Sequence, residues 1–196
     1  IVFQDRVESN IEKMRDLLKS VNPTLDLQNL CPHVKTHKSI RMTKMLLDAG
    51  VRFFKSSLNE IDMLVQAGAP KIFVAYPLLE RDAELVADYM VDFPNIRFVV
   101  QLSRREHAEI LSKLSREKNI NWHYYVDANI GMNRTGLPIE NAFEFFQSLQ
   151  QKPYFTFAGL HAYDGHIHHT TIEERRQASG DSMARLKKAV EQFSVN

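Results

Sequence analysis

Apolar and polar residues alternate along this chain with two periods, one of about 3.6 residues and one of two. Segments with the helical period are separated by short apolar runs that are typical of strands. The predicted helices cover 5–21, 39–49, 57–67, 81–91, 103–114, 138–149 and 172–194, and the predicted strands cover 30–37, 51–54, 71–75, 96–100, 122–127 and 155–162. The pattern therefore predicts an α/β protein.

The order of these elements limits the fold to two architectures. The strands are rich in apolar residues, as in parallel sheets covered on both faces, and right-handed crossovers leave a barrel or an open doubly wound sheet. No glycine-rich nucleotide-binding loop follows the first predicted strand, which argues against the open sheet. Because a (β/α)8 TIM-like barrel needs about 250 residues and eight strands, we expect residues 1–196 to be one incomplete barrel domain with about six strands.

Several predicted helices have recognisable end signals. Asp5 and Ser39 are candidate N-caps. Capping boxes begin at Ser57 and at Ser103, where a glutamate follows three residues later. Gly68 stands just past the end of its predicted helix.

Composition excludes some function classes. Lys plus Arg number 25 and Asp plus Glu number 24, so no charge excess indicates nucleic acid or a membrane surface as a partner. No apolar run approaches the roughly 20 residues of a membrane span, and nothing at the N-terminus is typical of a signal peptide. The single cysteine excludes an intrachain disulfide and fits a reducing, cytoplasmic location.

The stretch Cys31 to Lys38 is the first candidate for chemistry. Alternation in a strand would place Cys31, His33, Lys35 and His37 on one face, which should point inward. A lysine amine in a pocket loses affinity for its proton and becomes a nucleophile that can form a Schiff base with an aldehyde. The alternative is an edge strand with solvated lysines.

Two later stretches also place polar groups after predicted strands, where barrel active sites lie. In residues 126–136, Gly131 and Gly136 permit positive φ, so the loop can aim Arg134 over the barrel mouth, unless that arginine is simply solvated. In residues 159–166, alternation puts His161 and Tyr163 on one face, where a ring could stack on a flat cofactor. The alternative there is a packed core histidine and tyrosine.

A third possibility concerns metal. His166, His168 and His169 are close in sequence, and two or three imidazoles can bind Zn²⁺. A loop of this composition is more often solvated, so no metal ligand is assigned within the chain.

Three motifs together resemble one enzyme family. Residues 32–38 (PHVKTHK) resemble the cofactor-lysine motif of the D-threonine aldolase and D-serine dehydratase family, which are pyridoxal-phosphate (PLP) enzymes of fold type III with a barrel like the alanine racemase N-terminal domain. Residues 126–136 and 159–166 resemble the second and third barrel motifs of that family, in the expected order. The resemblance covers essentially the whole chain.

The resemblance implies a role for each candidate residue. Lys35 would hold PLP as an internal aldimine, and Arg134 would lie near the phenolic oxygen of the cofactor. Tyr163 would occupy the position whose ring stacks against the pyridine, and His33 and His161 would line the same pocket. One departure is Tyr125, which stands where alanine racemases often have a lysine that orients the arginine.

The function that this resemblance implies is a lyase, either an aldolase or a dehydratase, acting on D-3-hydroxy amino acids. It further implies a homodimer and a C-terminal β domain, absent from this chain, that binds a divalent metal such as Zn²⁺ or Mn²⁺. Two alternatives stay open: an amino-acid racemase of the alanine racemase type, and a non-catalytic PLP carrier protein.

Overall fold

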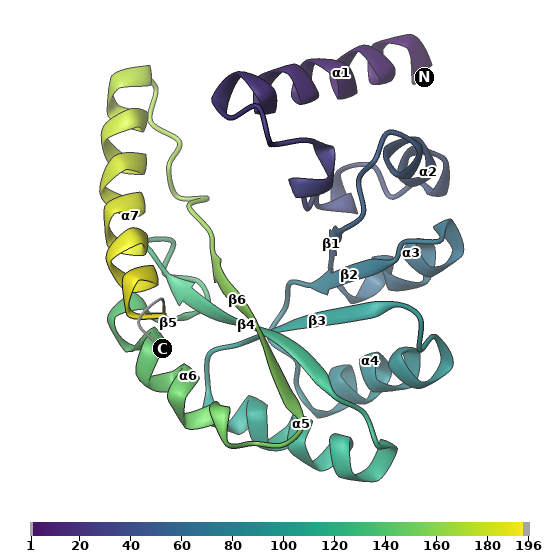
Figure 1. Ribbon diagram of the computed structural model, residues 1–196, viewed down its shortest axis with the longest axis vertical. Coiled ribbons are helices and arrows are strands. Elements are labelled where there is room, and N and C mark those ends of the chain that lie inside the picture. Colours follow the sequence, from purple (N-terminus) through teal and green to yellow (C-terminus); the bar gives the residue numbers. More distant parts are fainter. Residues whose placement is uncertain (1, 194–196) are drawn as a thin grey trace. The chain divides into compact units, whose positions relative to one another are not determined.

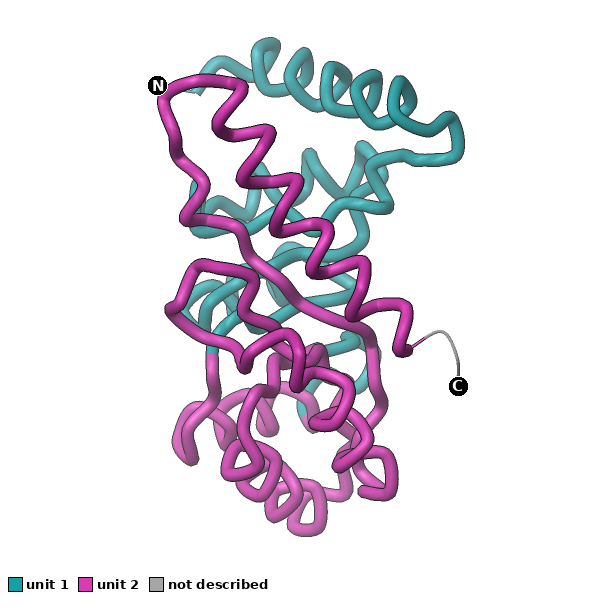
Figure 2. Tube along the Cα trace, turned by 90° about the vertical axis from the view of Figure 1, so that its left-hand side faces the viewer, with its two compact units in different colours: residues 1–76, 92–98 teal, residues 77–91, 99–196 magenta. Residues whose placement is uncertain are grey.

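The computed structural model describes residues 2–193, and the chain divides into two compact units. The first comprises residues 1–76 and 92–98, and the second comprises residues 77–91 and 99–196 (Figure 2). Within the described residues, both units consist of parallel strands and helices, as the sequence pattern predicts. No described helix is long and apolar enough to cross a membrane.

The first unit is built on two short parallel strands (Figure 1). Its elements are α1 (Gln4–Val21), α2 (Ile40–Asp48), β1 (Phe54–Ser56), α3 (Ile61–Ala67), β2 (Lys71–Val74) and the start of β3 (Arg97–Leu102), with 3-10 turns at Leu27–Asn29, Val34–Thr36 and Leu58–Glu60. Phe54 pairs with Ile72, and both are fully buried with Ile61 and Leu64 of α3. Strand β2 is buried on both faces, with Ile72 and Val74 on one face and Phe73 on the other, as in a covered parallel sheet.

The second unit is organised around one long strand (Figure 1). Its elements are α4 (Glu80–Asp92), the rest of β3, α5 (Arg105–Lys118), β4 (Trp122–Asn129), β5 (Leu137–Pro138), a 3-10 turn (Ile139–Asn141), α6 (Ala142–Gln150), β6 (Phe155–Ala162) and α7 (Ile172–Phe193). Strand β4 pairs in parallel with β3, β5 and β6. Trp122 and Tyr124 are buried, and the Trp122 indole donates to the carbonyl of Leu111 at 3.1 Å, which ties β4 to α5.

The prediction of a strand over 30–37 is wrong. The segment makes one isolated parallel bridge, from His33 to Lys55, and then enters the 3-10 turn Val34–Thr36. The amides of His37 and Lys38 both donate to the carbonyl of Val34, which closes the turn. Six strands are present among the described residues, but one of them, β5 (Leu137–Pro138), lies where the sequence predicted the start of a helix.

The helix end signals were predicted with mixed success. Ser39 caps α2 by accepting from the Met42 amide, the Ser57 capping box is present, and Gly68 ends α3 with φ 84°. The cap predicted at Asp5 is wrong because the N-cap of α1 is Phe3, two residues earlier, so that Asp5 lies in the first turn. The box predicted at Ser103 is also wrong, because α5 begins a residue later with Arg104 at its N-cap. The last predicted helix ends at Phe193, and residue 194 lies outside the described residues.

Candidate active site

The lysine turn, residues 33–38, holds Lys35 on the first unit. Val34 of this turn is fully buried. The Lys55 amide donates to the carbonyl of Pro32 at 2.9 Å, which joins the start of the turn to β1. Lys35 itself is exposed. The strand alternation from which an inward Lys35 was predicted is absent, because a turn and not a strand presents this residue.

Two histidine rings flank this turn and stabilise its backbone. The Nδ1 atom of His33 accepts from the amide of Lys35 at 3.3 Å, and the Nδ1 atom of His37 accepts from the amide of Ser39 at 3.1 Å. An imidazole nitrogen can accept only when it carries no proton. Burial lowers the pKa of both histidines, and the cations of Lys35 and Lys55 lower that of His33 further. Both rings are thus kept in the neutral form that these bonds require.

A buried carboxylate stands beside the turn. Glu60 is 3% exposed, and its Oε2 accepts from the amide and the hydroxyl of Ser57 at 2.8 and 2.7 Å. Its Oε1 lies 3.4 Å from the Nζ of Lys38. Burial alone would raise the pKa of Glu60, but the bonds from Ser57 and the charge of Lys38 outweigh it, so that its pKa is lowered from 4.5. Glu60 therefore links the lysine turn to the start of α3.

Two polar atoms of the first unit are buried without a hydrogen-bond partner among the described residues. They are the Oγ of Ser56, at the end of β1, and the Nε2 of His37. A buried polar atom left unpaired costs about 1–3 kcal/mol. Unpaired polar atoms at these positions could bind a polar group of a ligand near the ends of the strands.

In the second unit, the predicted residue His161 meets a buried aspartate. The Nδ1 of His161 and the Oδ1 of Asp127 are 2.7 Å apart, and the Nε2 of Gln101 donates to Oδ2 of Asp127 at 3.1 Å. Asp127 is 3% exposed and Gln101 is 4% exposed. These residues come from the carboxyl-terminal halves of β3, β4 and β6, which are neighbours in the sheet.

The loop after β4 brings Arg134 to Tyr163. Asn129 shapes the loop, because its side-chain oxygen accepts from the amides of Gly131 and Asn133. The Arg134 guanidinium lies 5.2 Å from the centroid of the Tyr163 ring. Gly131 and Gly136 have φ of 135° and 89°, as their predicted role in a tight loop requires.

The space beneath this arginine is small. A cavity of about 10 Å³ is lined by Asp127, Asn129, Arg134 and Tyr163, among others. This is room for about one water molecule. The ring of His166 packs over Gly131, where an added Cβ would lie 2.5 Å from its Nε2 atom.

The structure thus brings some predicted residues together and adds others. Arg134 contacts Tyr163 in the second unit, and His33 contacts the backbone of Lys35 in the first. The sequence did not indicate that Asp127 contacts both His161 and Gln101, and it indicated Glu60 only as a capping residue. Among residues 2–193, no group of three or more His, Cys, Asp or Glu side chains could hold a metal ion.

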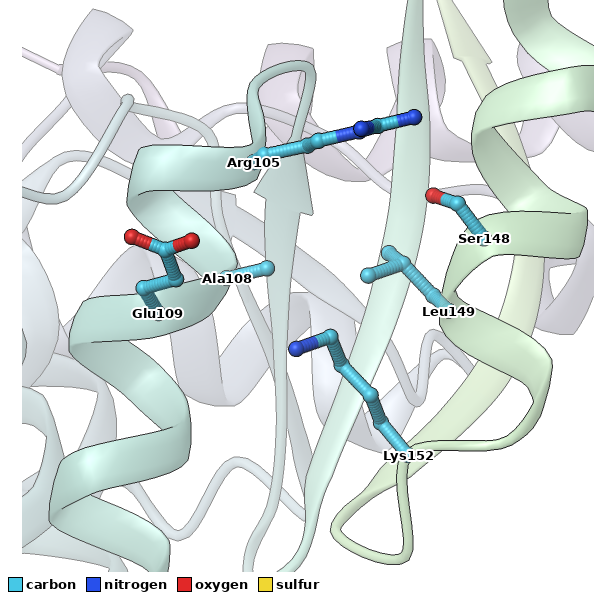
Figure 3. Close-up of a pocket in the computed structure, with 6 residues that line it drawn as sticks. All are labelled: Arg105, Ala108, Glu109, Ser148, Leu149 and Lys152. Carbon is cyan, nitrogen blue, oxygen red and sulfur yellow. The ribbon is translucent and has the colours of Figure 1, made fainter.

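A larger cavity lies on the helical side of the second unit (Figure 3). It has a volume of about 290 Å³ and is lined by Arg105, Ala108 and Glu109 of α5, Ser148 and Leu149 of α6, and Lys152. None of the predicted site residues lines it.

Comparison with known proteins gives one family match, which spans nearly the entire chain. The family described as alanine racemase, N-terminal domain, matches residues 2–196. Among curated proteins, the chain is 25% identical over 197 residues to 3-hydroxy-D-aspartate aldolase of Paracoccus denitrificans (strain Pd 1222), covering 97% of this chain and 49% of that protein.

Solved structures show the same fold at low identity. D-threonine aldolase from Filomicrobium marinum matches with a TM-score of 0.83 and 22% identity, over 97% of this chain and 50% of that one. D-threo-3-hydroxyaspartate dehydratase from Delftia sp. HT23 matches with a TM-score of 0.84 and 17% identity, over 99% and 50%. An alanine racemase of Clostridium difficile 630 matches with a TM-score of 0.71 and 16% identity, over 94% and 50%. The chain spans about half the length of these relatives.

Proposed function

We propose that this chain, which belongs to the alanine racemase N-terminal domain family, is the PLP-binding part of a lyase for D-3-hydroxy amino acids. The chain has the barrel-type fold of that family, and its three motifs resemble those of PLP enzymes of fold type III. The aldolases and the dehydratase that it matches are named for substrates with a D-configured amino acid and a 3-hydroxyl group. The single observation that supports the proposal most is the lysine turn, which presents an exposed lysine beside a fully buried Val34 in the first motif.

Lys35 is the proposed covalent anchor. The turn leaves its amine exposed, while bonds at His33 and Val34 hold its backbone. PLP, when bound, supplies an electron sink at the α-carbon of the amino acid. The chain's own residues would then bind and orient it: Arg134 by its guanidinium, Tyr163 by its ring face, and His33 and His161 as pocket residues. The unpaired Ser56 hydroxyl fits a polar cofactor.

A divalent metal belongs to the same proposal. One of the solved relatives is a D-threo-3-hydroxyaspartate dehydratase mutant in the metal-free form. A metal held outside residues 1–196, Zn²⁺ or Mn²⁺, would polarise the 3-hydroxyl group as a Lewis acid. We expect activity of the full-length protein to fall on chelation and to return with added metal.

The anchor is tested by comparing two neighbouring lysines. We expect wild-type protein and Lys38→Ala to bind PLP, to absorb visible light, and to retain a pyridoxyl group on Lys35 after borohydride reduction and peptide mapping. Lys35→Ala should lose all three properties. Both residues are exposed, so neither change should disturb the fold. A pyridoxyl group found on Lys38 would contradict the assignment of Lys35 as the covalent anchor.

The reaction class is tested on the full-length protein. We expect it to cleave or dehydrate D-threonine or D-3-hydroxyaspartate with a divalent metal present, and to leave the L-isomers untouched. Rapid interconversion of D- and L-alanine that is insensitive to chelators would favour the racemase. Bound PLP without turnover of either substrate would favour the carrier. Sedimentation of the holoprotein would test the homodimer.

A further inference from the structure

The cavity between α5 and α6 is lined by two cations that have no counter-charge. Arg105 lies at the start of α5 and Lys152 follows the end of α6, and both line the same space of about 290 Å³. Among residues 2–193, neither of these two side chains forms an ion pair or a hydrogen bond. By contrast, Arg185 of α7, in the same unit, pairs with Glu140 at 3.0 Å. The charges of Arg105 and Lys152 are therefore available to a ligand.

The two cations face the cavity from opposite helices (Figure 3). The side chain of Arg105 extends from α5 toward α6, and that of Lys152 extends back toward α5. Glu109 is the one acid among the lining residues, and its carboxylate points away from the space between the two cations. A cleft lined by one sign of charge concentrates ions of the opposite sign. The cavity therefore attracts anions.

The surface between the cations is apolar and selects the shape of the anion. Ala108 is 0% exposed and Leu149 is 1% exposed, and both line the cavity. Ser148 offers no donor to an anion, because its hydroxyl already donates to the carbonyl of Phe145 at 2.7 Å. A phosphate ion would leave the apolar surface uncovered, and no aromatic side chain is among the lining residues to stack on a nucleotide base. The lining fits a short hydrocarbon body with an anionic group at each end.

We propose that this cavity is a binding site for a small aliphatic dicarboxylate. The guanidinium of Arg105 donates two parallel hydrogen bonds to one carboxylate, and the ammonium of Lys152 pairs with the other. The methylene groups between them cover Leu149. The bound ligand links α5 to the end of α6 and so stabilises the second unit. None of the residues proposed to bind PLP lines the cavity, so this proposal goes beyond the proposed function and does not rest on it.

Isothermal titration calorimetry of the full-length protein with succinate tests the proposal. We expect one succinate to bind per chain, with an affinity that falls as NaCl is added, because the cavity is open to solvent. Arg105→Gln and Lys152→Gln should each weaken binding by about 10-fold, since each removes one charge-assisted contact. Arg185→Gln, which removes the same charge from the same unit, should leave the affinity unchanged. Butyrate, which lacks the second carboxylate, should also bind about 10-fold more weakly than succinate.

A gain of affinity separates the proposal from mere damage to the fold. Glu109→Gln removes the negative charge nearest the cavity, so it should tighten succinate binding, which a misfolded variant would not do. Circular dichroism without ligand should give the Arg105→Gln variant the unfolding midpoint of the wild type, because this side chain has no partner to lose.

Four results would overturn the proposal. They are no succinate binding by the wild type at low salt, weaker binding by Glu109→Gln, phosphate binding as tight as that of succinate, and binding that survives Arg105→Gln but is lost in Arg134→Ala. The last result would place the succinate beside Tyr163 instead. Failure of the protein to bind PLP would contradict the proposed function and leave these measurements unaffected.

Discussion

Replacement of Glu60 by alanine tests how the lysine turn is held. Glu60 is 3% exposed and accepts two bonds from Ser57, at 2.8 and 2.7 Å. Its other oxygen pairs with Lys38, whose side chain is 61% exposed. Alanine would remove the acceptor for the Ser57 amide at the start of α3 and leave Lys38 without its partner.

The expected cost follows from these contacts. Loss of a helix-capping interaction costs about 0.5–2 kcal/mol, and hydrogen bonds to a charged acceptor contribute about 1.5–3 kcal/mol. Since these estimates describe partly the same bonds, we expect Glu60→Ala to lower the free energy of unfolding by about 2–3 kcal/mol. The pair with the exposed Lys38 adds less than about 1 kcal/mol. Lys38→Ala should therefore cost far less than Glu60→Ala.

Urea unfolding followed by circular dichroism measures both variants at neutral pH and again well below pH 4.5. The pKa of Glu60 is lowered in the folded protein, so its stabilising contribution is present above 4.5 and is lost as the pH falls through the folded value. The difference between wild type and Glu60→Ala should shrink in acid. Equal costs for Lys38→Ala and Glu60→Ala, or a pH-independent difference, would show that the charge pair or the packing, and not the capping bonds, stabilises this region.

Three further changes test the rest of the site. Arg134→Ala should weaken PLP binding but lower the free energy of unfolding by only about 0.5–1 kcal/mol, because this exposed arginine contacts one ring. A large loss of stability would show that Arg134 has a structural role. Gly136→Ala should lower the free energy of unfolding by about 1–3 kcal/mol, since φ is 89° and the new Cβ would lie 2.9 Å from a backbone nitrogen. The control Gly180→Ala, in open space on α7, should raise the free energy of unfolding by about 1 kcal/mol. The free energy of unfolding should fall as the pH drops below 6.5, because burial lowers the pKa of His33 and His37 in the folded state. Urea unfolding between pH 8 and pH 5 checks this, and His33→Asn should make the free energy of unfolding depend less steeply on pH.

Local signals explain most of what the sequence could predict. Helical periods, the Ser57 capping box and the Gly68 end depend on neighbours within a few residues, and all three are present. The strand predicted over 30–37 failed because alternation ignores side-chain bonds to the backbone. His33 and His37 each accept from an amide two residues later, which stabilises a turn. Such bonds require neutral rings, and burial, which sequence does not show, keeps them neutral.

Long-range pairing explains the rest. The two residues Leu137–Pro138 form a strand only because Ala128 and Asn129 lie beside them. Arg134 and Tyr163 were predicted from two separate motifs, and their side chains contact each other in the second unit. The bonds of Gln101 and Glu60 could not be predicted, because they depend on strands and turns that meet only in the folded chain.

A bulge in β6 decides which side chain meets Asp127. At the start of the pairing Trp122 lies opposite Phe155, an offset of 33 residues, but Asp127 lies opposite His161, an offset of 34. The register shift falls where Tyr124 and Tyr125 pair with Phe157 and Gly159, and Gly159 has φ of 130°.

The bulge also sets the faces of the strand. Phe157 packs on Phe146 and Phe193 of the helices, so strict alternation from Phe157 would turn His161 toward those helices as well. The extra residue reverses the phase, and Leu160 and Ala162 line a groove with α7 while His161 bonds to Asp127. The faces predicted for residues 159–163 were correct because that prediction began at Gly159, beyond the irregularity. The bulge therefore permits the buried contact between Asp127 and His161, which a strand without the extra residue would not allow.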